Sequence, residues 1–323
     1  MTDLPRLAAL AAMLMLSSAH GLAQDAYPSR PIRILVGFTA GGTTDIIARV
    51  VGQKMNESWG QAVTIDNRPA AGGIVAGAMV AQAPPDGYTL LVGSIGPLAI
   101  SPSLKTDMPY DNLRAFAPIT MLAAVSNVLV VHPSLPVRDF KEYLAYAKAN
   151  PGKINFGSTG VGTAAHLSGE LMKQVAGLDM VHVPYRGAVA VNDLLVGRIE
   201  TMFATMPSVI GHVRANALRP IAVTSAKRAA TLPDTPTVAE SGFPGFESSS
   251  WFAMLGPAGM APEIQRKLHG EVVRILNLPD VRTSLSDQGA DPVGNTPEEL
   301  GAYIRSETEK WAKIIKAAGI KAE

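Results

Sequence analysis

Cysteine is absent from this sequence of 323 residues, and the common catalytic patterns are absent with it. Without cysteine there can be no disulfide, no thiolate nucleophile and no cysteine-bound zinc. The sequence also contains neither a G-x-S-x-G elbow nor an H-E-x-x-H zinc motif. Its six histidines are scattered and share no metal-ligand spacing with acidic residues. The sequence therefore predicts no catalytic residue, no bound metal and no cofactor.

Charged residues are few, at 17% of the chain, and they nearly cancel to a formal net charge of +1. No run of basic residues occurs, and none is interleaved with aromatic side chains, so nucleic acid is not an expected partner. Apolar residues make up 47% of the chain. A chain of this length and composition folds around a large core and has room for two lobes.

The only segment with the features of a targeting signal is residues 1–23. LAALAAMLML is a short apolar block, and SSAHGLA has the small residues of a cleavage region, with cutting expected after Ala23. The block is too short to span a bilayer, and no other segment is long and apolar enough to do so. Export of a chain without cysteine fits a bacterial periplasm better than an animal secretome, where disulfides are common.

Strand and helix patterns alternate along the rest of the chain, which predicts an α/β architecture with helices covering parallel sheets. FAPITML and NVLVVHP are interpreted as two separate apolar runs, and the Pro-, Gly- and Ser-rich region 231–262 as a connection. Two helical patterns follow, at 262–277 and 297–317. We expect two α/β lobes, with the chain crossing between them more than once and a ligand cleft between them.

The first candidate site is GFTAGGTTD, residues 37–45, between an apolar strand and a helix. Gly41 and Gly42 let the backbone approach a ligand, and Thr43 or Thr44 is the expected N-cap. Free N–H groups and the helix dipole favour an anion there. The lysine of a nucleotide-binding P-loop is missing. Asp45 is placed to pair with Arg49 on the helix surface. From this stretch alone, a ligand site and an ordinary strand–helix turn both stay open.

The second candidate site is INFGSTGVGTAAHLSGELM, where Gly160 lies among the hydroxyl residues Ser158, Thr159 and Thr163 that precede a helix. The segment 160–165 also matches G-x-G-x-x-A, which keeps a nicotinamide-dependent dehydrogenase open. Asp179, the acidic residue near the expected distance, comes before the next strand instead of at its end. His166 lies in the first turn of the helix, where a structural hydrogen bond is commoner than a catalytic role.

The third candidate site is HVPYRG, where Tyr185 and Arg186 follow an apolar strand. Ligands of open α/β sheets lie beyond the carboxyl ends of strands. Tyr185 offers a ring or a hydroxyl, and Arg186 offers a partner for a carboxylate, although a surface arginine would give the same pattern.

Taken in order, these stretches resemble the Bug-type periplasmic solute receptors, the extracytoplasmic binding components of tripartite tricarboxylate transporters. The matching stretches run nearly end to end: YPSRPIRILVGFTAGGTTDIIAR, DNRPAAGG, PPDGYTLLVGS, YAKANPGKINFGSTGVGTAAHL, HVPYRGA, LPDTPTVAESGFPGFE, GPAGMAP and WAKIIKAAGI. Their presence together and in this order is specific, whereas no single stretch is.

The resemblance implies a type II periplasmic-binding-protein fold, with two α/β lobes and an interlobe ligand cleft. It places 24–125 and 247–323 in the first lobe and 126–246 in the second. It implies that the loops at 38–45 and 157–166 face each other and hold a ligand carboxylate through backbone groups, hydroxyls and bridging waters. The implied ligand-binding residues, by position, are Phe38, Thr39, Gly41, Gly42, Thr43, Asp45, Ser94, Ser158, Gly160, Thr163, His166, Tyr185 and Arg186.

The implied function is capture of a small carboxylate in the periplasm, without catalysis, and its delivery to the membrane subunits of a transporter. A di- or tricarboxylate, an acidic amino acid and an aromatic carboxylate all stay open as ligands. We expect a monomer, and a periplasmic sensor domain stays open as a further partner. The alternative is an exported α/β enzyme, either a nicotinamide-dependent oxidoreductase or a hydrolase.

Two positions depart from the family's usual residues. Thr39 stands where proline is usual, and Ala70 stands where glycine is usual. Thr39 adds a hydroxyl and frees an N–H at the cleft, which bears on which ligand is accepted.

Overall fold

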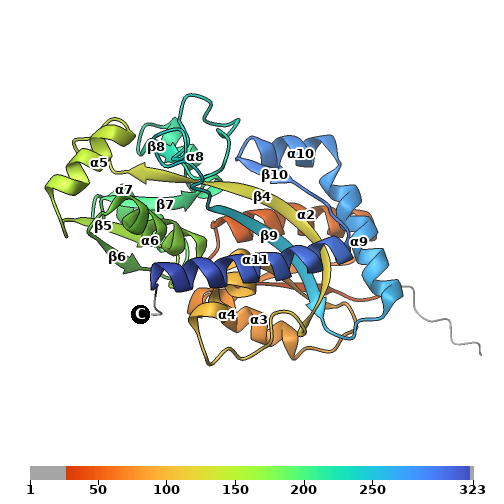
Figure 1. The fold of residues 1–323 in the computed structure, drawn as a ribbon. Helices are drawn as coiled ribbons and strands as arrows, with labels where there is room; N and C mark the ends of the chain where they lie inside the picture. The colour runs from red at the N-terminus through yellow and green to blue at the C-terminus, as the bar shows by residue number, and fades with distance from the viewer. Residues whose placement is uncertain (1–26, 321–323) are drawn as a thin grey trace, which may run out of the picture.

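A computed structural model describes residues 27–320, so the expected export signal at 1–23 lies outside the described residues. Strands and helices alternate along the described chain, as the sequence predicts, and the strands form two halves of one continuous sheet system (Figure 1). We name the part built on each half the first lobe and the second lobe. None of the helices within 27–320 is long and apolar enough to cross a membrane.

The first lobe is built on the strand order β2-β1-β3-β9-β4, with β10 pairing on β4. β1 lies parallel to both β2 and β3, whereas β9 is antiparallel to β3 and to β4. The bounds of these strands are β1 (Ile32–Val36), β2 (Val63–Asn67), β3 (Thr89–Ser94), β4 (Phe116–Val131), β9 (Ser249–Pro257) and β10 (Ala290–Pro292).

The second lobe repeats the same order as β6-β5-β7-β4, with β8 also pairing on β4. Its own strands are β5 (Ile154–Ser158), β6 (Met180–Pro184), β7 (Thr201–Thr205) and β8 (Arg219–Val223). β1 lies between β2 and β3 in the first lobe, and β5 lies between β6 and β7 in the second. The next strand, β9 or β4, is antiparallel to β3 or β7, so the two lobes share one topology.

β4 belongs to both lobes, which corrects one expectation from the sequence. FAPITML and NVLVVHP form one strand of 16 residues, whose first part pairs with β9 and whose last part pairs with β7 and β8. Ala123, Ala124, Val125 and Ser126 join the two apolar runs, and because they carry no turn residue the strand continues through them.

The region 231–262 is only partly a connection, which corrects a second expectation. It contains β9, a strand paired on both sides, with Trp251 and Phe252 almost fully buried. The chain therefore crosses between the lobes in β4 and again between β8 and β9. At the second crossing, Ser250 donates a hydrogen bond to the side-chain oxygen of buried Asn127 at 2.9 Å, which ties the two crossing segments together.

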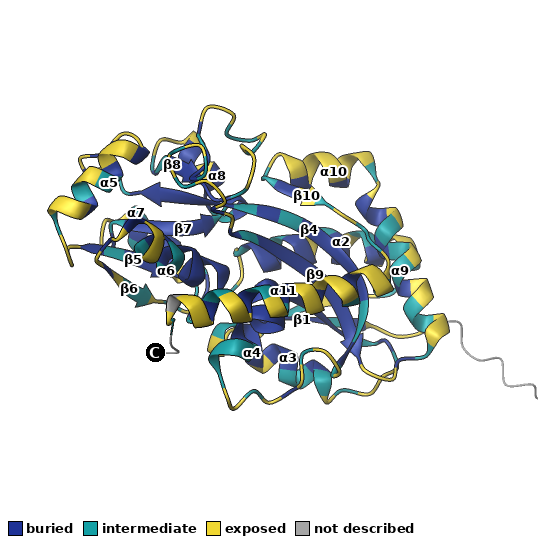
Figure 2. Cartoon of the chain, in the orientation of Figure 1, coloured by how far each residue is buried: buried dark blue, intermediate teal, exposed yellow. Residues whose placement is uncertain are grey.

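Helices cover both faces of each lobe, and their apolar sides lie on the buried strands (Figure 2). The helices of the first lobe are α2 (Thr43–Trp59), α3 (Ile74–Ala81), α4 (Ser101–Leu104), α9 (Pro262–Leu276), α10 (Pro279–Ser286) and α11 (Pro297–Ala318), with short 3-10 and π turns at η2 (Ala71–Gly73) and η3 (Gly96–Ile100). Those of the second lobe are α5 (Phe140–Ala149), α6 (Ala164–Ala176), α7 (Val189–Leu195) and α8 (Met206–Arg214).

The last long helix, α11, lies along the outside of the first lobe and reaches α6 of the second (Figure 1). It begins at a capping box, in which Thr296 and Glu299 each bond the other's backbone N–H. Its buried Glu307 accepts hydrogen bonds from the indole N–H groups of Trp251 and Trp311, which fixes the helix on β9. α10 and β10 were not expected from the sequence.

Candidate functional site

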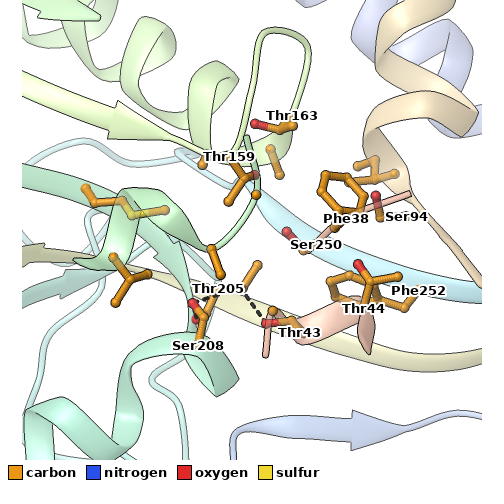
Figure 3. Close-up of a pocket in the computed structure, with 18 residues that line it drawn as sticks. Phe38, Thr43, Thr44, Ser94, Thr159, Thr163, Thr205, Ser208, Ser250 and Phe252 are labelled. Carbon is orange, nitrogen blue, oxygen red and sulfur yellow. Dashed lines mark hydrogen bonds between the residues drawn. The ribbon is translucent and has the colours of Figure 1, made fainter. Parts of the chain in front are cut away.

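A small cavity, which we name the inner cavity, lies where the two lobes meet (Figure 3). The centre of a water-sized group can occupy a volume of about 60 Å³ within it. A few water molecules or one small polar group fill such a space. Among the described residues, those that line it carry no charged side chain. They are Phe38, Gly42, Thr43, Thr44, Ser94, Ile95, Thr159, Thr163, Ala164, Ala165, Gly187, Ala188, Val191, Met202, Thr205, Ser208, Ser250 and Phe252.

Hydroxyl groups supply the polarity of this inner cavity. Eight of the lining residues are serine or threonine, and Figure 3 shows that they come from both lobes. Thr43, Thr44 and Ser94 belong to the first lobe, Ser250 to β9 at the crossing, and Thr159, Thr163, Thr205 and Ser208 to the second lobe. A hydroxyl both donates and accepts, so the cavity binds a polar group without carrying a charge of its own.

Three helices of eight or more residues begin at the cavity, and none of the three has a side-chain cap. The N-cap residues of α2, α6 and α8 are Gly42, Thr163 and Thr205, and none of the three forms a side-chain capping bond. α5 and α11, at the surface, do have such caps. Free N–H groups and three helix dipoles directed at one place favour an anion there.

The lobes contact each other around the cavity through hydrogen bonds and close backbone packing. Thr43 Oγ1 of the first lobe lies 2.7 Å from Thr205 Oγ1 of the second, and the bond is drawn in Figure 3. Ala188 N of the second lobe donates to Thr39 Oγ1 of the first at 2.8 Å. Gly96 faces the carbonyl of Gly162 so closely that a Cβ at 96 would lie 3.1 Å from its oxygen. The described arrangement is therefore closed over the cavity.

Asp45 lies at the start of α2 but does not line the cavity. Its buried carboxylate accepts hydrogen bonds from Gly41 N at 2.9 Å, Arg49 Nε at 2.9 Å and Asn67 Nδ2 at 3.0 Å. Burial alone would raise the pKa of Asp45, but these bonds and the charge of Arg49 outweigh it and hold the pKa below its usual value. The expected pair with Arg49 is confirmed, whereas the expected threonine N-cap is wrong because Gly42 takes that position.

Gly41 has its own reason to be glycine, since its φ of +82° lies in the left-handed region that other residues disfavour. Its N–H, held by Asp45, fixes the turn that leads from β1 into α2. Asp45 and Gly41 thus shape the loop that carries Phe38, Gly42 and Thr43 to the cavity.

Ser158 and His166 also lie behind the cavity, under the loop that joins β5 to α6. Ser158 is fully buried, and its hydroxyl shares a 2.7 Å hydrogen bond with His182 Nε2 and accepts one from Gly160 N at 3.1 Å. His166 accepts a bond from Gly162 N at 3.3 Å, and its ring lies 4.2 Å from the ring of His182. Together these groups fix the loop that brings Thr159 and Thr163 to the cavity.

Gly160, Tyr185 and Arg186 line a second cavity, of about 280 Å³, that lies next to the inner one and shares lining residues with it. We name it the outer cavity. The other residues that line it are Gly37, Phe38, Pro69, Ala70, Ala71, Gly72, Lys105, Thr159, Val161, Pro184 and Gly187. Of the predicted site residues, Phe38, Gly42, Thr43, Ser94 and Thr163 line the inner cavity, whereas Thr39 lies beside it in the interlobe contact.

Sequence reasoning noted Thr44 and Thr159 in the two loops without counting them as ligand-binding residues, and it missed four other residues that line the inner cavity: Thr205, Ser208, Ser250 and Phe252. A signal was present for Thr205 and Ser208, because the strand pattern ETMFATM ends in Thr205-Met206 and is followed by a helix-starting proline and a second hydroxyl. Ser250 and Phe252 gave no such signal, since they lie in the region interpreted as a connection.

Within residues 27–320, no group of three or more histidine or acidic side chains is placed to hold a metal ion. The two lobes share one topology and close over a small cavity that is rich in hydrogen-bond donors. This arrangement is typical of solute-binding receptors, which enclose a ligand between two lobes and release it by reopening.

The chain belongs to the family described as the tripartite tricarboxylate transporter family receptor (TctC), whose sequence pattern matches residues 47–320. One relative, from Pseudomonas sp. strain P51, is a protein encoded in the tcbD-tcbE intergenic region. It is 40% identical over 96% of this chain and 92% of its own length. The protein BugT of Bordetella pertussis is 37% identical, over 94% of each chain.

Solved structures of related chains have the same fold. A protein of R. palustris solved with adipate has a TM-score of 0.89 at 36% identity and covers 91% of this chain and 99% of its own. The periplasmic binding protein BugD has a TM-score of 0.89 at 33% identity, over 92% of this chain and 100% of its own. MatC of Rhodopseudomonas palustris, solved with malate, has a TM-score of 0.85 at 29% identity, over 90% of this chain and 100% of its own.

These comparisons confirm the resemblance to Bug-type receptors and the two-lobed periplasmic-binding-protein fold. The chain is a receptor of this family and not an enzyme, so the alternative of an exported oxidoreductase or hydrolase is not supported. The G-x-G-x-x-A match at 160–165 lies in the loop that faces the interlobe cavity.

Proposed function

We propose that this protein captures a small organic carboxylate in the inner cavity and delivers it to the membrane subunits of a tripartite tricarboxylate transporter. The observation that carries the proposal is the uncharged lining, with eight hydroxyl residues and the uncapped starts of α2, α6 and α8. A carboxylate accepts several hydrogen bonds at once, and it gains from the helix dipoles without needing a cationic partner.

Two of the solved relatives support the same ligand chemistry, because they are described with adipate and with malate, which are both dicarboxylates. With about 60 Å³ open to the centres of water-sized groups, the inner cavity has room for a carboxylate together with a bridging water. The site residues that we propose to contact the ligand are those of the inner cavity, and Asp45, Ser158 and His166 hold the loops that present them.

The proposal also covers the cellular compartment of the protein and the division of its chain into two lobes. The receptor acts in the periplasm as a monomer, after export directed by residues 1–23. The first lobe comprises 24–125 and 247–323, and the second comprises 126–246. The change in pairing along β4, from β9 to β7 and β8, supports a boundary near residue 126. Membrane subunits, and a periplasmic sensor domain, would distinguish the closed receptor from the open one.

Thermal unfolding tests the proposal on protein stripped of ligand by refolding. Adipate or malate at a hundred times its dissociation constant adds about 2.7 kcal/mol of stability, which raises the melting temperature by several degrees. Adipamide, the neutral diamide of the same length as adipate, is the matched control and should give little shift. If neither these acids nor a panel of mono-, di- and tricarboxylates raises the melting temperature, the proposal is wrong.

A further inference from the structure

The inner cavity accounts for only one end of a ligand. Its lining has hydroxyl and backbone donors but no cation, so nothing in it balances the charge of a second anionic group. Burying a second carboxylate there would place two like charges together in a site of low dielectric, which is strongly unfavourable. A ligand with two anionic groups therefore needs a second place to bind.

The outer cavity lies next to the inner one, and the two share Phe38, Thr159 and Gly187. With a volume of about 280 Å³, the outer cavity is the larger, and its lining includes the end of β6 and the loop before α3. A ligand held by one end in the inner cavity has to pass these shared residues to reach it. The ring of Phe38 gives such a ligand an apolar surface for its carbon chain.

Charge distinguishes the outer cavity from the inner one. Its lining includes Lys105, which follows α4 of the first lobe, and Arg186, which follows β6 of the second. The described lining contains no aspartate or glutamate. Neither cation forms an ion pair with any residue in the described part of the chain, although most other arginines of the protein do. Two cations without acidic partners, one from each lobe, favour an anion between them.

We infer that the outer cavity holds the second carboxylate of the ligand between Lys105 and Arg186, so that the receptor selects linear dicarboxylates over monocarboxylates. This inference rests on the proposed function, since the first carboxylate must occupy the inner cavity. The spacer between the carboxylates has to run past Phe38 and Thr159, which favours several methylene groups, as in adipate, over the short chain of malate. Because the two cations come from different lobes, the second carboxylate also draws the lobes together.

The test compares adipate with hexanoate, which has the same number of carbons but only one carboxylate. Calorimetry gives the two affinities for the wild type, for Lys105→Gln, for Arg186→Gln and for the double variant. Lys153→Gln and Arg138→Gln, both exposed and outside the two cavities, are the matched controls for the loss of a positive charge. Ligand-free melting temperatures verify that every variant is folded.

We expect the wild type to bind adipate at least tenfold more tightly than hexanoate and malate, with an affinity for adipate that falls as salt is added. In the double variant this preference should fall to less than threefold, mainly through weaker binding of adipate, whereas both controls should keep the preference of the wild type. A preference for adipate that survives in the double variant, or a wild type without the preference, overturns the inference and leaves the proposed function standing. A wild type that binds no carboxylate overturns both.

Discussion

Thr39 and Ala188 join the two lobes beside the inner cavity, because Ala188 N donates a hydrogen bond to Thr39 Oγ1 at 2.8 Å. The packing around this bond is tight. Gly187, with φ at +68°, passes so close to Thr39 that a Cβ there would lie 2.5 Å from the hydroxyl oxygen. A proline at position 39 has no side-chain oxygen to accept this bond. The hydroxyl of Thr39, which stands where proline is usual in the family, therefore lies in the interlobe contact and not in the cavity lining.

The first prediction concerns Thr39→Val, which keeps the shape of the side chain but removes the acceptor. When the lobes close, the Ala188 N–H would lose its partner, at a cost of about 1–2 kcal/mol to closure. Because ligand binding requires closure, we expect an affinity for adipate that is roughly five- to thirtyfold weaker. Calorimetry provides the measurement. Thr283→Val, on exposed α10, is the control, and equal affinities of the two variants would contradict the role of this bond.

The second prediction uses the close approach of Gly96 to Gly162. A Cβ at position 96 would lie 3.1 Å from the Gly162 carbonyl oxygen of the other lobe, so Gly96→Ala should obstruct closure. We expect adipate to bind roughly tenfold more weakly, while the ligand-free protein melts within a few degrees of the wild type. Gly211→Ala on α8 is the matched control, because a Cβ there meets nothing within 4 Å. If Gly96→Ala binds as well as Gly211→Ala, the lobes have a different closed arrangement.

Much of the fold could be predicted from the sequence, because alternating strand and helix patterns with clear stop signals are local. Asn150-Pro151-Gly152, for example, is a strong stop signal, and α5 ends at Ala149, directly before it. The length of β4 was not predictable in this way, since a strand that runs through two sheets has the same local pattern as two shorter strands. β9 was missed because the Gly-, Pro- and Ser-rich residues before it dominate the composition of its region.

The candidate site was only partly predictable, for a different reason. Sequence patterns identified which loops meet at the cavity, but they did not show the direction of each side chain. Asp45 and Thr44 are neighbours in the first turn of α2, yet Thr44 lines the cavity and Asp45 is held away from it by Gly41, Arg49 and Asn67. Asn67 comes from β2, so only the folded chain brings it to Asp45.

The third prediction follows from that network around Asp45. Asp45→Ala would remove the acceptor of three hydrogen bonds at a side chain that is only 3% exposed. We expect unfolding in urea to require about 2–3 kcal/mol less free energy, because three donors, one of them charged, lose the buried carboxylate that accepts their hydrogen bonds. Affinity should fall as well, since the loop from Phe38 to Thr43 loses its support. Asp234→Ala, at an exposed aspartate, should change stability by less than about 0.5 kcal/mol. An Asp45→Ala variant as stable as Asp234→Ala would show that the network does not support the loop.

The last prediction concerns the stability of the protein in acid and depends on His182. Its ring shares a hydrogen bond with Ser158, lies 4.2 Å from the ring of His166 and stacks on Phe156 at 4.9 Å. Burial, reinforced by the positive charge of Lys173, lowers the pKa of His182 to about 4, whereas a histidine in the unfolded chain titrates near 6.5. Between these values the unfolded chain binds a proton that the folded protein does not.

The stability supplied by this difference is therefore present above pH 6.5 and is lost as the pH falls toward 4. Allowing for the partial exposure of the ring, we expect His182 to account for about 1–2 kcal/mol of the stability lost between pH 7 and pH 5. Urea unfolding at the two pH values gives this loss. His182→Gln should show a smaller loss than the wild type because glutamine does not titrate. If His182→Gln and the wild type lose the same free energy of unfolding between pH 7 and pH 5, folding does not lower the pKa of His182, and the prediction is wrong.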